Sequence, residues 1–296
     1  MTVPGGQNTS PRQAPRQPEA GLMAGKSARA ASDATAGSDA DEPGLLRVAG
    51  VSYTYPTTHT HALDHVSLTV HEGEFVSVVG PSGCGKSTLV QAAAGLISGY
   101  DGTITFKNEL IKNPHPKIGV VFQEDSTFPW RTALRNVEFG LEMQGMSKKA
   151  RKSQAMDMLA LVGLDKFADH YPSQLSGGMK QRVTIARTLV TEPALLLMDE
   201  PFGALDEQTR MLLGEELLRI QQQLRQTVLF ITHSISESIM LSDRVALMSR
   251  GPGRIKDVIA VGFPRPRQPD LVSTPEYGVQ SARIWGSIRE ESPRQE

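Results

Sequence analysis

The sequence predicts an α/β fold with a mainly parallel core sheet, an antiparallel β subdomain and a helical subdomain. Four short apolar runs rich in branched residues each end in a polar residue or glycine, as buried parallel strands do: FVSVVG, IGVVFQ, LLLMDE and VLFITH. Two earlier runs, LLRVAGVSYTY and ALDHVSLTV, alternate as half-buried antiparallel strands do. A long segment with helical spacing separates the second apolar run from the third.

The bulk composition indicates an ordinary globular protein. The chain has 296 residues, 39% hydrophobic and 21% charged, and its formal net charge is -1. This balance gives no global electrostatic reason to bind nucleic acid, so we expect no nucleic-acid partner. No stretch approaches the roughly 18 to 20 uninterrupted apolar residues that span a bilayer. If the chain works at a membrane, we expect another chain to bring it there.

Composition shifts divide the chain into three parts. Residues 1–43 are rich in Pro, Gly, Ala and Ser with almost no large apolar side chains, which predicts a disordered N-terminal tail. Residues 44–263 carry the strand and helix patterns and form the predicted folded domain, with the helical subdomain at about 124–192. Residues 264–296 begin with a Pro-rich stretch and continue with only a weak pattern, and we assign them as a C-terminal extension.

The segment GPSGCGKST fits the phosphate-loop pattern and lies between a predicted strand and a predicted helix, where that loop belongs. Glycines let backbone N–H groups turn toward phosphate oxygens, and the helix N-terminus adds its positive dipole end. The lysine is expected to reach the β- and γ-phosphates, and the serine hydroxyl to bind Mg²⁺. The predicted ATP-binding residues are Gly80, Pro81, Ser82, Gly83, Cys84, Gly85, Lys86, Ser87 and Thr88.

Two carboxylates end the strand LLLMDE, which places them at the carboxyl edge of the sheet where ligands bind in open α/β folds. We expect Asp199 in the magnesium shell. Glu200 would then face the γ-phosphate and act as the base for the attacking water. Strands often end in solvated acids, so the prediction depends on the phosphate loop upstream.

The segment LSGGMKQR begins a predicted helix with Ser176, Gly177 and Gly178. A hydroxyl and unobstructed N–H groups near a helix N-terminus indicate a second anion site. An ordinary helix cap would give the same pattern. Because the phosphate loop has a helix terminus of its own, a second one is most simply explained if two chains enclose the nucleotide between them.

Together, GPSGCGKST, LSGGMKQR and LLLMDEP resemble the ATP-binding cassette (ABC) family over about Leu45 to Phe263. The resemblance implies a P-loop NTPase fold, hydrolysis of Mg-ATP, and an ATP-dependent head-to-tail dimer with a second copy of the chain. It also implies further site residues. Gln123 would contact magnesium and the attacking water, His233 the γ-phosphate, and Asp206 the dimer interface. Tyr55 would stack on adenine, although a strand residue packed in the core would look the same.

Three further segments resemble the ATPase subunit of nitrate, sulfonate and taurine importers: FQEDSTFPWRTALRNVEFGLE, DEPFGALDEQTR, and SRGPGRI followed by FPRPR. That resemblance implies a transmembrane permease partner, an external solute-binding protein, and a place at the cytoplasmic face of the inner membrane. Phe128, Pro129 and Trp130 match the segment near the permease, unless Trp130 packs within the helical subdomain. Ser234 departs from the aspartate usual after the histidine. The alternative function is a cassette ATPase without a permease, such as an iron–sulfur assembly ATPase.

Overall fold

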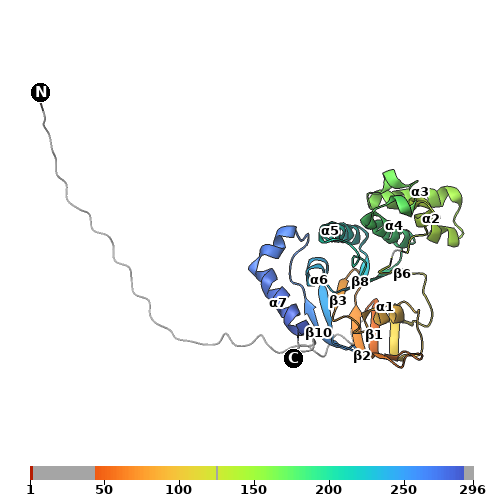
Figure 1. The fold of residues 1–296 in the computed structure, drawn as a ribbon, viewed down its shortest axis with the longest axis horizontal. Coiled ribbons are helices and arrows are strands. Elements are labelled where there is room, and N and C mark those ends of the chain that lie inside the picture. The colour runs from red at the N-terminus through yellow and green to blue at the C-terminus, as the bar shows by residue number, and fades with distance from the viewer. Residues whose placement is uncertain (3–43, 125, 290–296) are drawn as a thin grey trace. The chain divides into compact units, whose positions relative to one another are not determined.

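The computed structural model describes Met1–Thr2, residues 44–124 and residues 126–289 (Figure 1). The predicted N-terminal tail therefore lies almost wholly outside the described residues. All helices and strands reported below fall within one compact unit.

A six-stranded sheet forms the centre of this unit, in the order β10-β9-β3-β8-β7-β6. Every neighbouring pair is parallel except β9 and β10. The mainly parallel core sheet is confirmed, although β6, the strand at one edge of this sheet, ends at Val121 and is shorter than the run IGVVFQ. The strands are β3 (Phe75–Val79), β6 (Ile118–Val121), β7 (Leu195–Asp199), β8 (Thr227–Thr232), β9 (Arg244–Met248) and β10 (Ile255–Ala260).

A four-stranded antiparallel sheet in the order β2-β1-β4-β5 forms the predicted β subdomain. Its strands are β1 (Leu46–Thr54), β2 (His61–Val70), β4 (Asp101–Phe106) and β5 (Glu109–Leu110). Apolar residues alternate along β1, where Leu46, Val48 and Val51 are buried. This sheet and the parallel sheet share one apolar core, with helix α1 (Lys86–Ala93) packed into it.

The helical subdomain contains three α-helices and two 3₁₀ turns: α2 (Ala133–Met143), α3 (Lys148–Leu161), η1 (Asp165–Phe167), η2 (Pro172–Gln174) and α4 (Gly177–Leu189). Its helices pack on one another and on β6, at the end of the unit away from β1 and β2 (Figure 1). At the start of each helix, the side chain of the capping residue accepts a hydrogen bond from a backbone N–H of the first turn. The capping residues are Thr132, Ser147 and Ser176. These caps explain why the helices begin where they do.

Alternate residues of β3 face different cores because successive side chains of a strand point to opposite faces. Val76 and Val78 join the core shared with the antiparallel sheet. Phe75 joins the core under the helical subdomain, which also includes residues of α5 (Glu207–Leu224). Val79 packs with α6 (Ile235–Leu241) and the C-terminal helix. The strand leading into the phosphate loop is therefore fixed from both sides.

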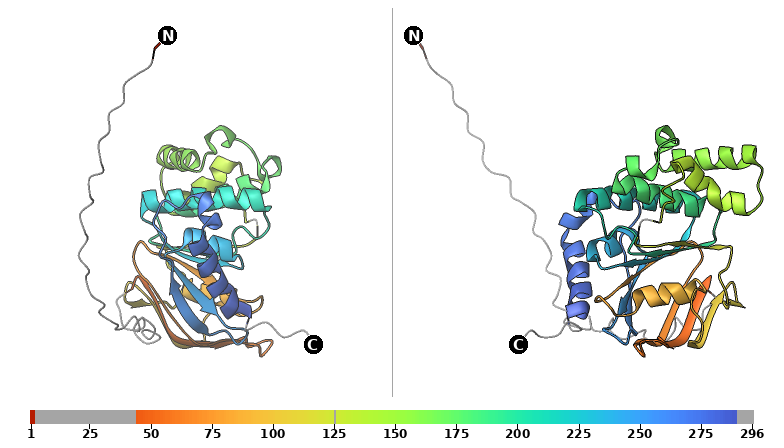
Figure 2. Two further views of the ribbon diagram at one scale, coloured as in Figure 1. Left: turned by 90° about the vertical axis from the view of Figure 1, so that its left-hand side faces the viewer. Right: turned by 45° about the vertical axis from the view of Figure 1, so that its right-hand side comes forward.

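The C-terminal extension is more ordered than its sequence pattern indicates. It forms a 3₁₀ turn, η3 (Pro269–Ser273), and a 15-residue helix, α7 (Pro275–Arg289), which packs against α6 and β9 (Figure 2). Only Ile284 of this helix is buried. Tyr277 and Ile288 pack against the same core while only partly buried, so the apolar stripe is thin and the sequence did not reveal the helix. The domain boundary at residue 263 stays a prediction.

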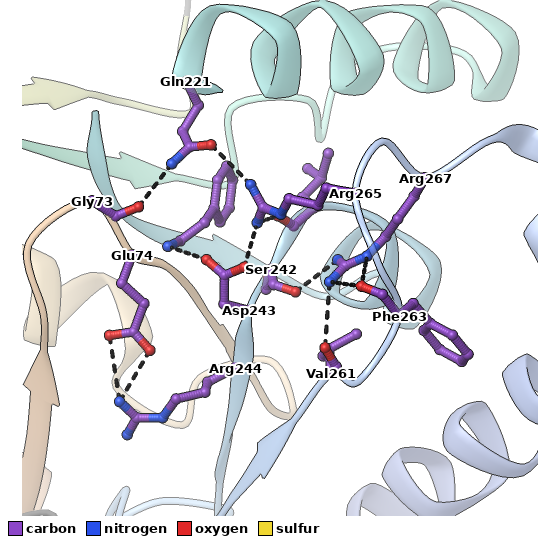
Figure 3. Close-up of polar contacts among 12 residues, drawn as sticks. Gly73, Glu74, Gln221, Ser242, Asp243, Arg244, Val261, Phe263, Arg265 and Arg267 are labelled. Carbon is purple, nitrogen blue, oxygen red and sulfur yellow. Dashed lines mark hydrogen bonds and ion pairs between the residues drawn. The ribbon is translucent and has the colours of Figure 1, made fainter. Parts of the chain in front are cut away.

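Two arginines of the FPRPR segment fasten this extension to the sheet (Figure 3). The Arg267 guanidinium donates to the carbonyl oxygens of Ile239 and Ser242, each at 2.7 Å, and to Val261 and Phe263. Arg265 pairs with Asp243 at 2.9 Å and also donates to Gln221 and the Leu241 carbonyl oxygen. The cation of Arg267 thus binds carbonyls at the C-terminal end of α6, where a helix leaves carbonyl oxygens without partners of its own.

No helix within the described residues is both long and apolar enough to traverse a bilayer.

Candidate functional site

The predicted site residues gather at the carboxyl edge of the parallel sheet. Strands β3, β8, β7 and β6 are consecutive parallel neighbours, so their carboxyl ends lie at one edge. Gly80 follows β3, His233 follows β8, Glu200 follows β7, and Gln123 lies two residues beyond the end of β6. Four segments far apart in sequence are thereby brought to the same edge.

The loop between β3 and α1 wraps around the ammonium group of Lys86. Its Nζ atom donates to the carbonyl oxygens of Gly80 and Pro81, each at 2.9 Å. Gly85 has φ +98°, and a Cβ there would lie 2.5 Å from the Ala62 carbonyl oxygen, so only glycine fits. At Gly83, with φ +74°, an added Cβ would meet nothing within 4 Å. This open, glycine-lined turn suits an anion that approaches the backbone.

The other loop residues differ in exposure. Ser82 and Gly83 are exposed, whereas Cys84 is fully buried behind the loop. Burial raises the pKa of the Cys84 thiol, and nearby Lys86 opposes that change. A buried neutral thiol is a packing residue, so Cys84 can serve the phosphate loop only through its backbone.

A hydroxyl and a carboxylate meet beside the loop. Ser87 Oγ donates to Asp199 Oδ1 at 3.0 Å. Burial is the main cause that raises the pKa of Asp199; the Ser87 hydrogen bond lowers it and the charge of Glu200 raises it further. Magnesium favours hard oxygen ligands of this kind, and a cation would relieve the burial of the Asp199 charge. The chemistry of this donor pair therefore fits Mg²⁺.

Glu200 and His233 are in contact across the edge, with Oε2 and Nδ1 3.2 Å apart. Glu200 has φ +44°, a left-handed backbone that is uncommon outside glycine and concentrates at functional sites. This turn directs the residue after β7 toward His233. The Gln123 amide nitrogen lies 3.4 Å from where a Cβ of Gly203 would stand, close to the Glu200 carbonyl oxygen. The predicted acid and histidine are thus in contact, and the glutamine side chain lies near the backbone that follows the acid.

Tyr55 lies just after β1, and its hydroxyl is 3.0 Å from Thr88 Oγ1 at the start of α1. Its ring meets Tyr53 edge-on, with centroids 5.0 Å apart. The side chain is half-buried, which leaves part of the ring accessible next to the phosphate loop. Stacking on adenine stays a prediction, because half-burial also suits a residue at the core's margin.

Ser176, Gly177 and Gly178 form the N-terminal end of α4, which lies beside the start of α5. Ser176 caps α4 by accepting from the Met179 N–H at 3.3 Å. A Cβ at Gly178 would lie 2.8 Å from the Thr209 methyl group, so the glycine allows the close approach of α5. Asp206 caps α5 and is exposed. The hydrogen bond from the Thr209 N–H lowers the pKa of Asp206. The cap and the exposed loop thus lie side by side on this surface.

Sequence reasoning missed three residues that support this edge: Thr232, Arg210 and Glu237. A signal for one of them existed, because Ser234 and Glu237 match the S-x-x-E pattern of a helix start. Ser234 does cap α6, accepting from the Glu237 N–H at 3.3 Å. Serine is about as good a cap as aspartate, so the departure at this position leaves the helix start intact.

Comparison with known proteins agrees with this geometry. The ABC transporter family model matches residues 63–203. The taurine import ATP-binding protein TauB of Rhizobium johnstonii is 49% identical over 195 residues, covering 66% of this chain and 74% of that protein. The bicarbonate transport ATP-binding protein CmpD of a Synechocystis strain is 44% identical over 258 residues, covering 85% and 91%.

Among solved structures, a dimeric ATP-binding cassette in a post-hydrolysis state, bound to ADP and Pi, is 33% identical. It superposes with a TM-score of 0.65 over 74% of this chain and all of that chain. The phosphate loop, the acidic strand end and these relatives agree: the chain belongs to the ABC transporter family.

Proposed function

We propose that this chain is the ATP-hydrolysing subunit of an ABC importer that drives uptake of a small anion or an organosulfur or nitrogen compound. The observation that carries the proposal is one sheet edge holding both the Ser87–Asp199 pair and the Glu200–His233 pair. The import proteins among its relatives favour an importer over a permease-free ATPase. The named substrates of those relatives, taurine and bicarbonate, support only a class of small anionic or zwitterionic cargo.

Each residue has a role in hydrolysis. Ser87, Asp199 and Gln123 would hold Mg²⁺, which when bound offsets the negative charge of the phosphates. Lys86 would exchange its two loop carbonyls for phosphate oxygens. Glu200 accepts a proton from the attacking water at Oε2. His233 keeps that carboxylate oriented and contacts the γ-phosphate. Tyr55 stacks on the adenine ring of ATP.

A second copy of the chain would complete the site. Ser176 and Gly177 are exposed and Gly178 is buried behind them at the start of α4, next to exposed Asp206. A helix N-terminus suits a phosphate, and these residues serve the partner's nucleotide in a head-to-tail dimer. The dimeric structure of a related cassette bound to ADP and Pi supports this arrangement.

The helical subdomain offers a surface for the permease. The side chain of Trp130 is 72% exposed, although its ring centroid is only 5.6 Å from that of Phe128. Beside it lies a hollow of about 560 Å³, also lined by Tyr171 and Leu134. Exposed aromatics beside a hollow are common at interfaces and are unusual for core packing. The permease, served by an external solute-binding protein, would hold the chain at the cytoplasmic face of the inner membrane.

The test is Glu200→Gln, which keeps the side-chain shape and removes the base. We expect ATP binding to persist and steady-state hydrolysis to fall by about two or more orders of magnitude. Sedimentation should show a dimer of this variant with Mg-ATP and a monomer without it. The matched control is Glu192→Gln, because Glu192 also has a left-handed backbone, φ +51°, but precedes β7. Near-normal turnover in Glu200→Gln would remove this residue as the base.

A further inference from the structure

A mostly buried carboxylate lies under the loop that carries His233. In the usual reciprocal helix cap, the glutamate side chain returns to the N–H of the capping residue. Here the Ser234 N–H donates instead to Thr232 Oγ1, at 2.9 Å. The Thr232 hydroxyl in turn donates to Glu237 Oε2. Glu237 therefore braces the residue immediately before His233.

The other oxygen of Glu237 faces helix α5. Glu237 Oε1 and Arg210 Nε form an ion pair at 3.4 Å, and the two side chains are only 12% and 17% exposed. Arg210 Nε makes no hydrogen bond within the described residues, so this contact is electrostatic, whereas Arg210 Nη2 donates to the Leu205 carbonyl oxygen at 3.0 Å. Leu205 immediately precedes Asp206. One arginine thus joins the loop before α5 to the carboxylate under His233.

Stability alone is a weak reason to bury such a pair. Desolvation is the main cause that raises the pKa of Glu237, opposed by its bond to Thr232 and by the charge of Arg210. Attraction between buried charges often only offsets their loss of hydration. The guanidinium, by contrast, fixes the direction of the Leu205 carbonyl by a hydrogen bond and holds Glu237 beside it by charge. The contact is therefore better suited to holding two loops in register than to strengthening the fold.

We propose that Arg210 and Glu237 are positioning residues that couple the loop at 203–206 to His233. This inference rests on the proposed ATPase function for its catalytic consequence. His233 acts on the nucleotide of its own chain, whereas Asp206 faces the second copy in the proposed dimer. The pair would therefore link the catalytic histidine of one site to the loop that meets the other.

The first test measures backbone hydrogen exchange in the full chain without nucleotide. Glu237→Gln should accelerate exchange at 203–206 as well as at 232–237, and Arg210→Gln should accelerate both segments too. Substitution of a residue with only a local role would accelerate exchange only in the segment that contains it. The control is Arg219→Gln, because Arg219 lies on the same helix, pairs with Glu216 at 2.7 Å and also binds a distant carbonyl, that of Leu161. Exchange that changes only within the mutated segment would overturn the coupling.

The second test measures steady-state ATP hydrolysis. Each variant should lower kcat about tenfold or more with KM within about twofold, because the pair orients groups that act in the transition state. The double variant should be no slower than the slower single one, since both changes break the same link. Unchanged kcat, or additive losses, would overturn the proposal.

A charge-preserving variant keeps the proposal testable if a neutral variant fails to fold. Arg210→Lys keeps the charge but cannot reach both the Leu205 carbonyl and Glu237 with one ammonium group. It should show the same paired acceleration of exchange, and unaltered exchange would overturn the proposal. Hydrogen exchange is measured without nucleotide and so does not depend on ATP hydrolysis. A wild-type chain that fails to hydrolyse ATP would refute the proposed function, and the exchange measurement would still decide whether the two loops are coupled.

Discussion

Replacing Arg267 should destabilise the fold from a position outside the catalytic edge. The side chain is 7% exposed, and burial lowers its pKa to about 10, so it stays charged at neutral pH. Arg267→Met keeps a long apolar stem and removes every donor. The carbonyl oxygens of Ile239 and Ser242, both bonded at 2.7 Å, lose a partner inside the protein.

The magnitude follows from those two acceptors. A buried acceptor left unsatisfied costs about 1–3 kcal/mol, so two cost about 2–6 kcal/mol. Methionine avoids burying a charge, which offsets part of the loss, and we expect a net destabilisation of about 3 kcal/mol. For a domain of this size that corresponds to a fall in Tm of roughly 6–12 °C.

The assay is urea and thermal unfolding followed by circular dichroism. The control is Arg283→Met on α7, whose ion pair with Asp257 at 3.3 Å joins side chains that are 59% and 45% exposed. Exposed pairs contribute about 0–1 kcal/mol, so this variant should unfold close to the wild type. If the two variants unfolded alike, the carbonyl-binding role of Arg267 in stability would be refuted.

Three other changes probe the site and its partner. Burial raises the pKa of Asp199 in the folded chain, so the folded chain binds this proton more tightly than the unfolded chain does. The resulting contribution to the free energy of unfolding is present at low pH and is lost as pH rises through the raised pKa. Asp199→Asn should therefore raise the Tm of the nucleotide-free chain at pH 7, unlike the exposed control Asp157→Asn, and an unchanged or lower Tm would contradict the burial argument. Trp130→Ala should reduce co-purification with the permease while ATP affinity and Tm stay nearly unchanged; intact assembly, or an unfolded subunit, would assign Trp130 to packing. Tyr55→Phe should keep ATP affinity within about twofold whereas Tyr55→Ala lowers it about fivefold, as loss of a stacking contact of about 1 kcal/mol requires, and equal affinities would exclude stacking.

Much of the fold could be predicted because its signals are local. Buried strands such as β7 are short continuous apolar runs, and the phosphate loop carries its own glycines and lysine. Helix α7 gave no such signal because only Ile284 is buried. The link from Arg210 to Glu237 joins helices distant in sequence, and only the packing of α5 on α6 reveals it. The assignment of individual site residues to ATP or Mg²⁺ stays a prediction.

The order of strands in the parallel sheet has a consequence for synthesis on the ribosome. Strand β3 lies between β8 and β9, and its first residue, Phe75, pairs with Val228. At about 5–20 residues per second, the strand before the phosphate loop waits roughly ten seconds or more for its neighbours to be made. During that interval the strand Phe75–Val79, in which four of the five residues are apolar, has no parallel neighbour to pair with. The nascent chain is therefore a candidate for chaperone binding at this segment, and shortening the delay should improve its yield.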